Sequence, residues 1–148
     1  MEAGDTAFEK ESWVSATLLG WGSCGKIVYS DSVPAGYVMY APPAYVPRSL
    51  AFPTSPISAD AVLLMTGQVL PEFEGGAIGR MMLQSLAKDL IRRNVRAIEA
   101  FGDEKGEAGK CMLPAAHLRA VGFKTVRPHH RYPRLRLELK SAVSWRED

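Results

Sequence analysis

The chain has 148 residues, which is enough for one domain with a hydrophobic core of its own. Hydrophobic residues make up 47% of it and charged residues 23%, the proportions of an ordinary globular protein, so a disordered chain is excluded. The 18 Lys and Arg residues against 16 Asp and Glu give a formal net charge of only +2, and this balance argues against a nucleic-acid-binding protein.

The cysteines and the first residues indicate a reducing, cytoplasmic setting. Cys24 and Cys111 are too few for a disulfide framework, so two free thiols are expected, with a single bridge as the alternative. The start M-E-A-G-D-T-A-F-E-K lacks the basic region and apolar run of a signal peptide. The longest apolar run, Ala61–Met65, is too short for a membrane span, and no pair of histidines has the spacing of zinc ligands. We therefore expect a cytoplasmic protein without a metal and without nucleic-acid or membrane partners.

The N-terminal third predicts a hairpin followed by a stiff loop. Residues 1–12 are polar and are expected to be flexible. Trp13–Trp21 fits a short helix or an irregular segment, and periodicity does not decide between them. Gly25–Tyr29 and Ala35–Tyr40 are β-rich runs joined by a turn-forming cluster, which predicts an antiparallel hairpin. Residues 41–56 contain five prolines, which prevent regular strand pairing and predict a stiff, ordered loop. The Tyr40–Tyr45 stretch, which prolines hold rigid, is the expected wall of a pocket.

The middle of the chain predicts a strand, a helix and a second strand. Ala61–Leu70 is apolar at nearly every position, as expected of a strand covered on both faces. The next segment, from about Ala77 to Arg93, has the period of an amphipathic helix, with Asn94 as its C-terminal cap. Arg96–Phe101 then predicts a strand parallel to the first, because a helix separates the two. The polar positions of this helix recur every fourth residue and are Arg80, Gln84, Lys88 and Arg92. The positions expected to face inward are Met82, Leu83, Leu86, Leu90 and Ile91.

The last third predicts a short helix and a second hairpin. Leu113–Val121 fits a helix that ends at Gly122. Phe123–Arg127 and Leu135–Leu139 alternate as two strands, so residues 123–140 are expected to form a C-terminal hairpin. Repeats and low-complexity tracts are absent from the sequence, and residues 1–148 are read as a single domain of mixed α and β structure.

A glycine-rich turn between the apolar strand and the long helix carries the chemical information. Gly75, Gly76 and Gly79, with the small Ala77, would let an anion approach the main chain, and Arg80 adds a charge. Free N–H groups and the helix dipole make a helix start attractive to phosphate. The alternative is a tight connection that binds nothing. A Walker motif is excluded because no Gly-Lys-Ser/Thr follows, and the dinucleotide fingerprint is excluded because Ala77 breaks its spacing.

The stretch V-L-P-E-F-E-G-G-A-I-G-R resembles the signature of the GNAT acyltransferases, V-x-P-x-x-R/Q-G-x-G-I/L-G-R. The V-G-F at residues 121–123 resembles the L-G-F that ends the second helix of that family, and the order of elements agrees from Gly25 to Leu139. The resemblance implies an α/β (α+β) fold with a mixed, mostly antiparallel sheet, a central splayed pair of parallel strands and flanking helices. The positions that match the signature are Val69, Pro71, Gly75, Ile78, Gly79 and Arg80.

The resemblance also implies an acyl-CoA-dependent N-acyltransferase, with acetyl-CoA as donor and a small-molecule or peptide amine as acceptor. Main-chain groups near Gln68, Val69 and Leu70 would bond to pantetheine, and the amide near Val69 or Leu70 would stabilise the oxyanion on the thioester carbonyl. The amides of Gly75, Gly76, Ala77, Ile78, Gly79 and Arg80 would hold the pyrophosphate. A degenerate domain that binds CoA esters as a sensor or interaction module is the alternative. A homodimer is one assembly that the protein could form.

Four departures from the family pattern bear on binding and catalysis. Glu74 stands where the family has Arg or Gln, and Ala77 stands at a glycine position. Leu118 stands where the family has a Tyr that protonates the leaving thiolate, so water or Tyr132 would have to serve. The family opens with a strand and two helices, and this chain has room for only one helix, so these elements are shortened or missing.

The general base is less well defined by the sequence than the coenzyme site. Glu99 lies on the strand beside the expected coenzyme gap and is the first candidate, with solvent or a core salt bridge as its alternative surroundings. Gln68 or Thr66 could instead position a water molecule that takes the proton.

Overall fold

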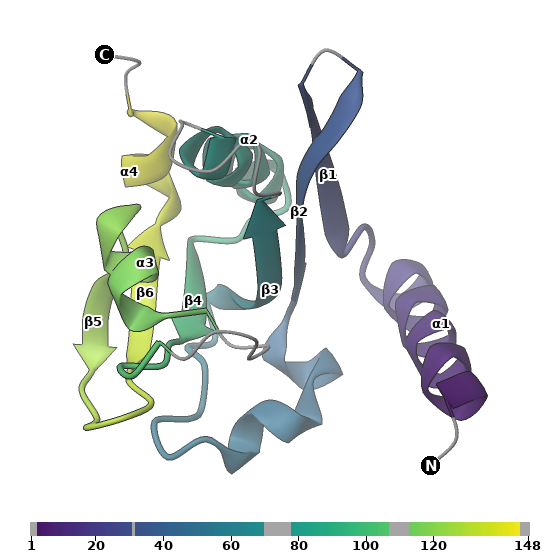
Figure 1. Cartoon of the computed structure of the whole chain (residues 1–148), viewed down its shortest axis with the longest axis horizontal. Coiled ribbons are helices and arrows are strands. Elements are labelled where there is room, and N and C mark those ends of the chain that lie inside the picture. Colours follow the sequence, from purple (N-terminus) through teal and green to yellow (C-terminus); the bar gives the residue numbers. More distant parts are fainter. Residues whose placement is uncertain (1–2, 31, 70–77, 107–112, 146–148) are drawn as a thin grey trace.

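One mixed sheet organises this computed structural model, which describes residues 3–30, 32–69, 78–106 and 113–145. In the described residues the sheet has six strands in the order β1-β2-β3-β4-β6-β5 (Figure 1). Only β3 and β4 pair in parallel, and the other neighbouring pairs are antiparallel. The strands are β1 Gly25–Ser30, β2 Val33–Ala41, β3 Ala61–Val69, β4 Ala97–Phe101, β5 Lys124–Arg127 and β6 Arg134–Glu138. Both predicted hairpins and the predicted parallel pair are confirmed.

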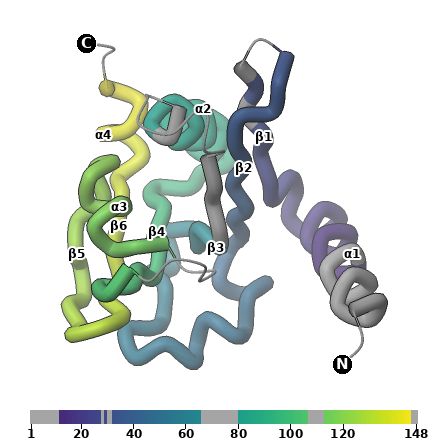
Figure 2. The backbone as a smooth tube through the Cα atoms, in the orientation of Figure 1, coloured from purple at the N-terminus to yellow at the C-terminus, as the bar shows by residue number. Residues whose placement is uncertain are grey.

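The helices of the described residues lie on one face of this sheet and beyond one of its edges. They are α1 Ala3–Gly20, α2 Ile78–Arg92, α3 Ala115–Ala120 and α4 Leu139–Val143, and two short 3-10 turns are η1 Pro43–Tyr45 and η2 Pro47–Ala51. α2 and α4 lie side by side near the C-terminus, whereas α1 lies beyond β1 at the opposite edge (Figures 1 and 2). Within the described part of the chain, none of the helices has the length and apolar character needed to cross a membrane.

The N-terminal helix is longer than the sequence pattern suggests. Residues 3–12 are helical, so the prediction of a flexible segment up to Ser12 is wrong as regards secondary structure. Ala, Glu and Lys, which occur in this stretch, are good helix formers. The Trp13 indole donates a hydrogen bond of 2.7 Å to the Tyr45 carbonyl, which attaches this helix to η1.

Helix α2 forms because its apolar positions recur with the helical period and pack on the sheet. Met82, Leu83, Leu86 and Leu90 are buried as predicted, whereas Ile91 is 40% exposed, contrary to the prediction. Gln84 was expected on the polar face. Its side chain is instead half-buried and donates to the carbonyls of Trp145 (2.9 Å) and of α4. This contact explains why a polar residue lies at the α2–α4 interface.

The end of α2 has the geometry of a Schellman cap. Asn94 has φ +64°, its N–H donates to the Ile91 carbonyl at 3.1 Å, and the Val95 N–H donates to the Leu90 carbonyl at 3.1 Å. The prediction of Asn94 as cap is therefore confirmed. Gly122, at φ +118°, ends the segment of α3 in a similar left-handed conformation, as its sequence position predicts.

Two apolar clusters cover the two faces of the central strands. Val62 and Leu64 of β3 face the larger cluster under α2, α3 and α4, whereas Ala61 and Leu63 face a smaller one. The smaller cluster is covered by the proline-rich loop that joins β2 to β3, through Val46 and Phe52 among others. Burial on both faces explains why β3 is apolar at nearly every position, instead of alternating.

The Asn94 cap generates the first prediction. Asn94→Ala should lower the free energy of unfolding by about 1 kcal/mol, because a side chain with a Cβ but no local hydrogen bond is unfavourable at positive φ. Asn94→Gly is the control and should cost much less, since glycine adopts this conformation without steric penalty. Urea unfolding measures both. Equal losses for the two variants would contradict the assignment of the cap.

Candidate active site

The parallel strands β3 and β4 separate after three residue pairs. They pair at Ala61–Ala97, Val62–Ile98 and Leu63–Glu99. Beyond these pairs β3 continues to Val69 with only β2 beside it, and β4 continues to Phe101 with only β6 beside it. Within the described strands, main-chain groups that face the opening gap have no strand partner across it. The predicted splayed pair is thus present, and its open end is where a ligand could take up main-chain hydrogen bonds.

A cavity of about 380 Å³ lies where the two strands part. β3 and β4 supply its floor, the segment before α3 supplies one side, and the loop around η2 supplies the opposite wall. Its lining residues are Val46, Arg48, Ser49, Phe52, Leu63, Leu64, Met65, Ala100, Phe101 and Leu113. This volume is in the range of small-ligand sites. The predicted wall, Tyr40–Tyr45, does not line this cavity, and the proline-rich wall is formed by residues 46–52 instead.

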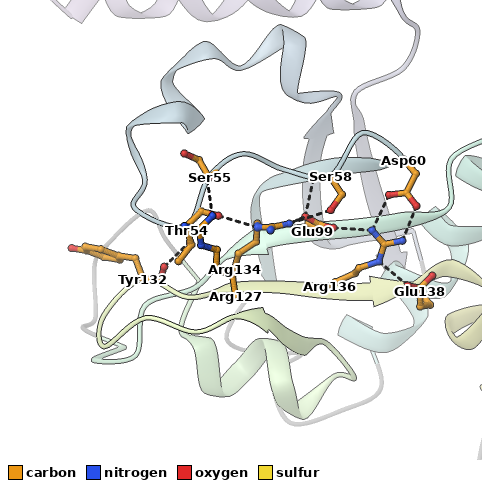
Figure 3. A network of polar contacts seen from close by, with 10 residues as sticks. All are labelled: Thr54, Ser55, Ser58, Asp60, Glu99, Arg127, Tyr132, Arg134, Arg136 and Glu138. Carbon is orange, nitrogen blue, oxygen red and sulfur yellow. Dashed lines mark hydrogen bonds and ion pairs between the residues drawn. The ribbon is translucent and has the colours of Figure 1, made fainter.

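Aromatic stacking and hydrogen bonds fix this wall. The Phe52 ring stacks on Phe101 of β4, with ring centroids 4.4 Å apart, and meets the Tyr132 ring edge-on at 5.9 Å. The Thr54 hydroxyl donates to the Tyr132 carbonyl at 2.8 Å, and the Arg134 Nε donates to the Thr54 carbonyl at 2.9 Å (Figure 3). The wall is therefore attached both to β4 and to the loop that precedes β6.

Glu99 is fully buried at the centre of an ion-pair network (Figure 3). Its Oε1 accepts hydrogen bonds from Arg134 Nη1 and from the Ser58 N–H (3.1 Å), and its Oε2 accepts one from Arg136 Nη1 at 2.8 Å. Arg136 also forms a fork with both carboxylate oxygens of Asp60, at 2.8 and 2.9 Å. The carboxylate thus ties β4 to β6 and to the loop before β3.

This arrangement opposes the prediction that Glu99 is the general base. Burial alone would raise its pKa, but the hydrogen bonds from Ser58, Arg136 and Arg134 outweigh burial and hold the pKa below its ordinary value. A carboxylate with a lowered pKa and two arginine partners is a weak proton acceptor. The core salt bridge, the alternative that the sequence left open, describes its surroundings.

The predicted coenzyme site falls partly outside the described residues. Leu70, Gly75, Gly76 and Ala77 lie there, as does Glu74. The two ends of the motif are described at the level of the backbone. Strand β3 ends at Val69, whose main chain pairs with Gly36, and helix α2 begins with Ile78, Gly79 and Arg80. A strand that borders the gap therefore leads to a helix start, which is the order that binding of a phosphate at the helix start needs.

Arg80 is exposed in the first turn of α2 and contacts the C-terminal part of the chain. Its guanidinium lies 4.5 Å from the centre of the Trp145 ring. Gln84, one turn further, donates to the Trp145 carbonyl at 2.9 Å. No local pattern predicts this contact, because Trp145 lies after the last predicted strand and 61 positions from Gln84 along the chain.

The remaining candidates differ in how close they come to the cavity. Tyr132 contacts Phe52 but is not among the residues that line the cavity. Gln68 pairs with Tyr37 of β2 through its main chain, and its side chain lies outside the described atoms. Leu118 is 3% exposed and belongs to the larger core, so no hydroxyl is available at that position. In the described part of the chain, no group of three or more His, Cys, Asp or Glu residues could hold a metal ion.

No protein-family model and no curated protein matches the sequence. Solved structures do match. A GNAT-family protein from Desulfovibrio desulfuricans aligns with a TM-score of 0.57 at 19% identity, over 90% of this chain and 80% of that one. The chain has the GNAT fold. The expected fold class is confirmed, since the six-stranded sheet and its splayed parallel pair in the described residues match that architecture.

Two further neighbours have the same fold. PaiA N-acetyltransferase from Thermoplasma acidophilum, in complex with coenzyme A, aligns with a TM-score of 0.56 at 14% identity, over 93% of this chain and 79% of that one. Ribosomal-protein-alanine N-acetyltransferase from Brucella melitensis aligns with a TM-score of 0.55 at 19% identity, over 88% and 77%. At these identities the likeness shows the fold, and chemistry has to be argued from the site.

The ion-pair network generates the second prediction. Glu99→Gln should lower the free energy of unfolding by about 3 kcal/mol at neutral pH, because the half-buried guanidinium groups of Arg134 and Arg136 lose the fully buried carboxylate that they share. Since the folded-state pKa of Glu99 lies below its ordinary value of 4.5, its contribution is present above pH 4.5 and is lost as the pH falls through the folded pKa.

Urea unfolding between pH 3 and pH 7 measures the effect. The wild-type protein should lose more stability on acidification than Glu99→Gln, although Asp60 and Glu104, whose pKa values are also lowered by arginine partners, still contribute in both. Glu138→Gln is the matched control, because it removes an exposed carboxylate from the same arginine. Equal stability of the Glu99 variant and the wild type would contradict the network's structural role.

Proposed function

We propose that this chain is an acyl-CoA-dependent N-acyltransferase that uses acetyl-CoA and transfers the acyl group to a primary amine. The observation that carries the proposal is the cavity between the separated ends of β3 and β4, on a strand that leads into the start of α2. A gap lined by main-chain groups suits an amide-bearing arm such as pantetheine, and a helix start suits a phosphate. The coenzyme A complex of PaiA, with the same fold, supports this assignment.

The chain's own residues have defined parts in this proposal. Main-chain groups of Gln68, Val69 and Leu70 would hold the pantetheine arm and the developing oxyanion. The amides of residues 75–80 and the Arg80 charge would hold the pyrophosphate. The coenzyme would supply a reactive thioester. The amine nitrogen then forms a bond to the acyl carbon as the C–S bond breaks, one proton leaves the nitrogen, and the sulfur takes up one proton.

Deprotonation of the amine is the step for which no side chain is obvious. With Glu99 paired to two arginines, a water molecule held by Gln68 or Thr66 is the proposed acceptor of the proton. The apolar cavity walls help, because burial disfavours the ammonium form and lowers its pKa. The departing thiolate has an ordinary pKa near 8.5 for a thiol, so water suffices as its proton donor, and Tyr132 would act only through water.

A CoA-binding module without catalysis is the second candidate. It is favoured by the burial of Leu118 in the core, at the position of the family's acid. The two candidates differ in one measurement. Incubation with acetyl-CoA and a panel of primary amines should release free thiol at a rate that depends on the amine. Coenzyme binding without any amine-dependent release would instead establish the binding module.

The third prediction concerns the coenzyme. CoA should raise the melting temperature by mass action, and at 100 times its Kd the stabilisation is about 2.7 kcal/mol. Gly79→Glu should abolish the shift by placing a bulky anion at the helix start. Lys88→Glu makes a carboxylate on the exposed middle of the same helix and should leave most of the shift. If the melting temperature of the wild type does not change up to millimolar CoA, the coenzyme assignment is wrong.

The fourth prediction concerns Glu74, which stands where the family has Arg or Gln. Replacing it by Arg turns repulsion of the pyrophosphate into attraction, so Glu74→Arg should raise CoA affinity about five- to thirty-fold at low ionic strength. The gain should shrink as salt is added, because exposed charges are screened. Isothermal titration at two salt concentrations measures it. A loss of affinity would mean that this loop is wrongly aligned with the family signature.

A further inference from the structure

Two polar residues interrupt the apolar lining of the cavity, and neither side chain has a partner among the residues that the structure describes. Arg48 and Ser49 come from η2, whereas every other lining residue is apolar. Arg48 is exposed and makes no ion pair or hydrogen bond with any of the residues that the structure describes. Most other arginines of the cavity's surroundings, such as Arg134 and Arg136, are bonded to carboxylates. Arg48 thus places an uncompensated positive charge at this site.

Ser49 is an independent sign that the cavity is built for a polar ligand. It is only 4% exposed, and its Oγ has no hydrogen-bond partner in the described structure. Its main chain is fully engaged, because its N–H donates to the Val46 carbonyl and its carbonyl accepts from the Phe52 N–H. A buried hydroxyl without a partner is unfavourable in the free protein. A ligand that bonds to it would remove that penalty.

We infer, on the basis of the proposed function, that the acceptor is an amino acid or similar small amine with an apolar body and a carboxylate, which Arg48 and Ser49 bind. A guanidinium forms a two-point bond with a carboxylate, and the Ser49 hydroxyl can donate to the same group. The apolar walls match a branched or aromatic side chain. One cation is too few for a pyrophosphate, which on this proposal lies at the start of α2 near Arg80.

The test compares two acids with their amides. The probes are L-leucine and L-phenylalanine against L-leucinamide and L-phenylalaninamide, assayed on wild type, Arg48→Gln and Arg92→Gln. Arg92 is exposed in the last turn of α2 and serves as the charge-matched control. Each kcat/KM for acid is divided by that for amide. An acid and its amide differ in the intrinsic reactivity of their amines, but this difference is the same for every variant. It therefore cancels when the ratio is compared between variants, as in a double-mutant cycle.

The expected result is a fall of about five- to thirty-fold in the acid-to-amide ratio for Arg48→Gln, mostly through KM, and no change for Arg92→Gln. The CoA-induced thermal shift should be the same in all three proteins. An unchanged ratio in Arg48→Gln would overturn the inference. Loss of the CoA shift in Arg48→Gln would also overturn it, because Arg48 would then serve the coenzyme.

Binding without turnover separates this inference from the proposed function. Titration of L-leucine and L-leucinamide into the protein saturated with CoA measures the same preference when no acyl group is present. If the wild type releases no thiol with any amine, yet binds the acid through Arg48, the proposed function fails and the inference stands. If thiol is released with no preference for acids over amides, the inference fails and the proposed function stands.

Ser49→Ala provides a second variant with opposite effects on stability and binding. Removal of a buried hydroxyl that has no partner should leave the melting temperature of the free protein unchanged or raise it by a few degrees. Affinity for L-leucine should fall about three- to tenfold, because the ligand loses one hydrogen bond. A lower melting temperature together with unchanged L-leucine affinity would show that Ser49 serves the fold alone.

Discussion

The buried carboxylate of Glu99 is the interaction on which the cavity depends. It lies at the last pair of the β3–β4 ladder, so the strands separate directly beyond it. Its two arginine partners come from β6, and its third hydrogen-bond donor is Ser58, in the loop that forms the cavity wall. Without this anchor, two half-buried guanidinium groups beside β4 would lose the carboxylate that they share, and among the described residues only Arg136 would keep other carboxylate partners, Asp60 and Glu138. The same residue thus holds the wall in place and marks the end of the strand pairing.

The two faces of the separated strands serve different needs. Helices α2, α3 and α4 cover one face with a large apolar cluster, and α2 is the first helix after β3 among the described residues. Among the described residues, the β2–β3 loop covers the other face, and its η2 turn provides Arg48 and Ser49. Prolines suit this role because they remove backbone freedom from a segment that has no ladder to hold it. On the proposed function, the start of α2 holds the coenzyme and the β2–β3 loop holds the acceptor. The sequences of these two segments can change independently of each other.

Sequence reasoning succeeded where a local pattern carries the information. The period of α2, its Asn94 cap and the parallel strand that follows were all predicted and are confirmed. It failed where the determinant is a distant partner. The salt bridges of Glu99 join residues 35 and 37 positions apart, and strand alternation predicts which face a side chain occupies but not what meets it there. Helix α4 was missed for a related reason, since five residues carry too little periodicity to be recognised.

Among the described side chains, neither Glu99, which is paired with two arginines, nor Leu118, which is buried in the core, can act as the acid or base of the proposed reaction. This does not exclude a useful rate, because holding two reactants in reacting geometry lowers the barrier by about 7–11 kcal/mol in well-oriented systems. The apolar walls also favour the neutral amine, which is the nucleophilic form. A thiolate with a pKa near 8.5 leaves without strong acid assistance. An acyltransferase built on this chain would therefore owe most of its rate to positioning, and its selectivity to the few polar groups that orient the acceptor.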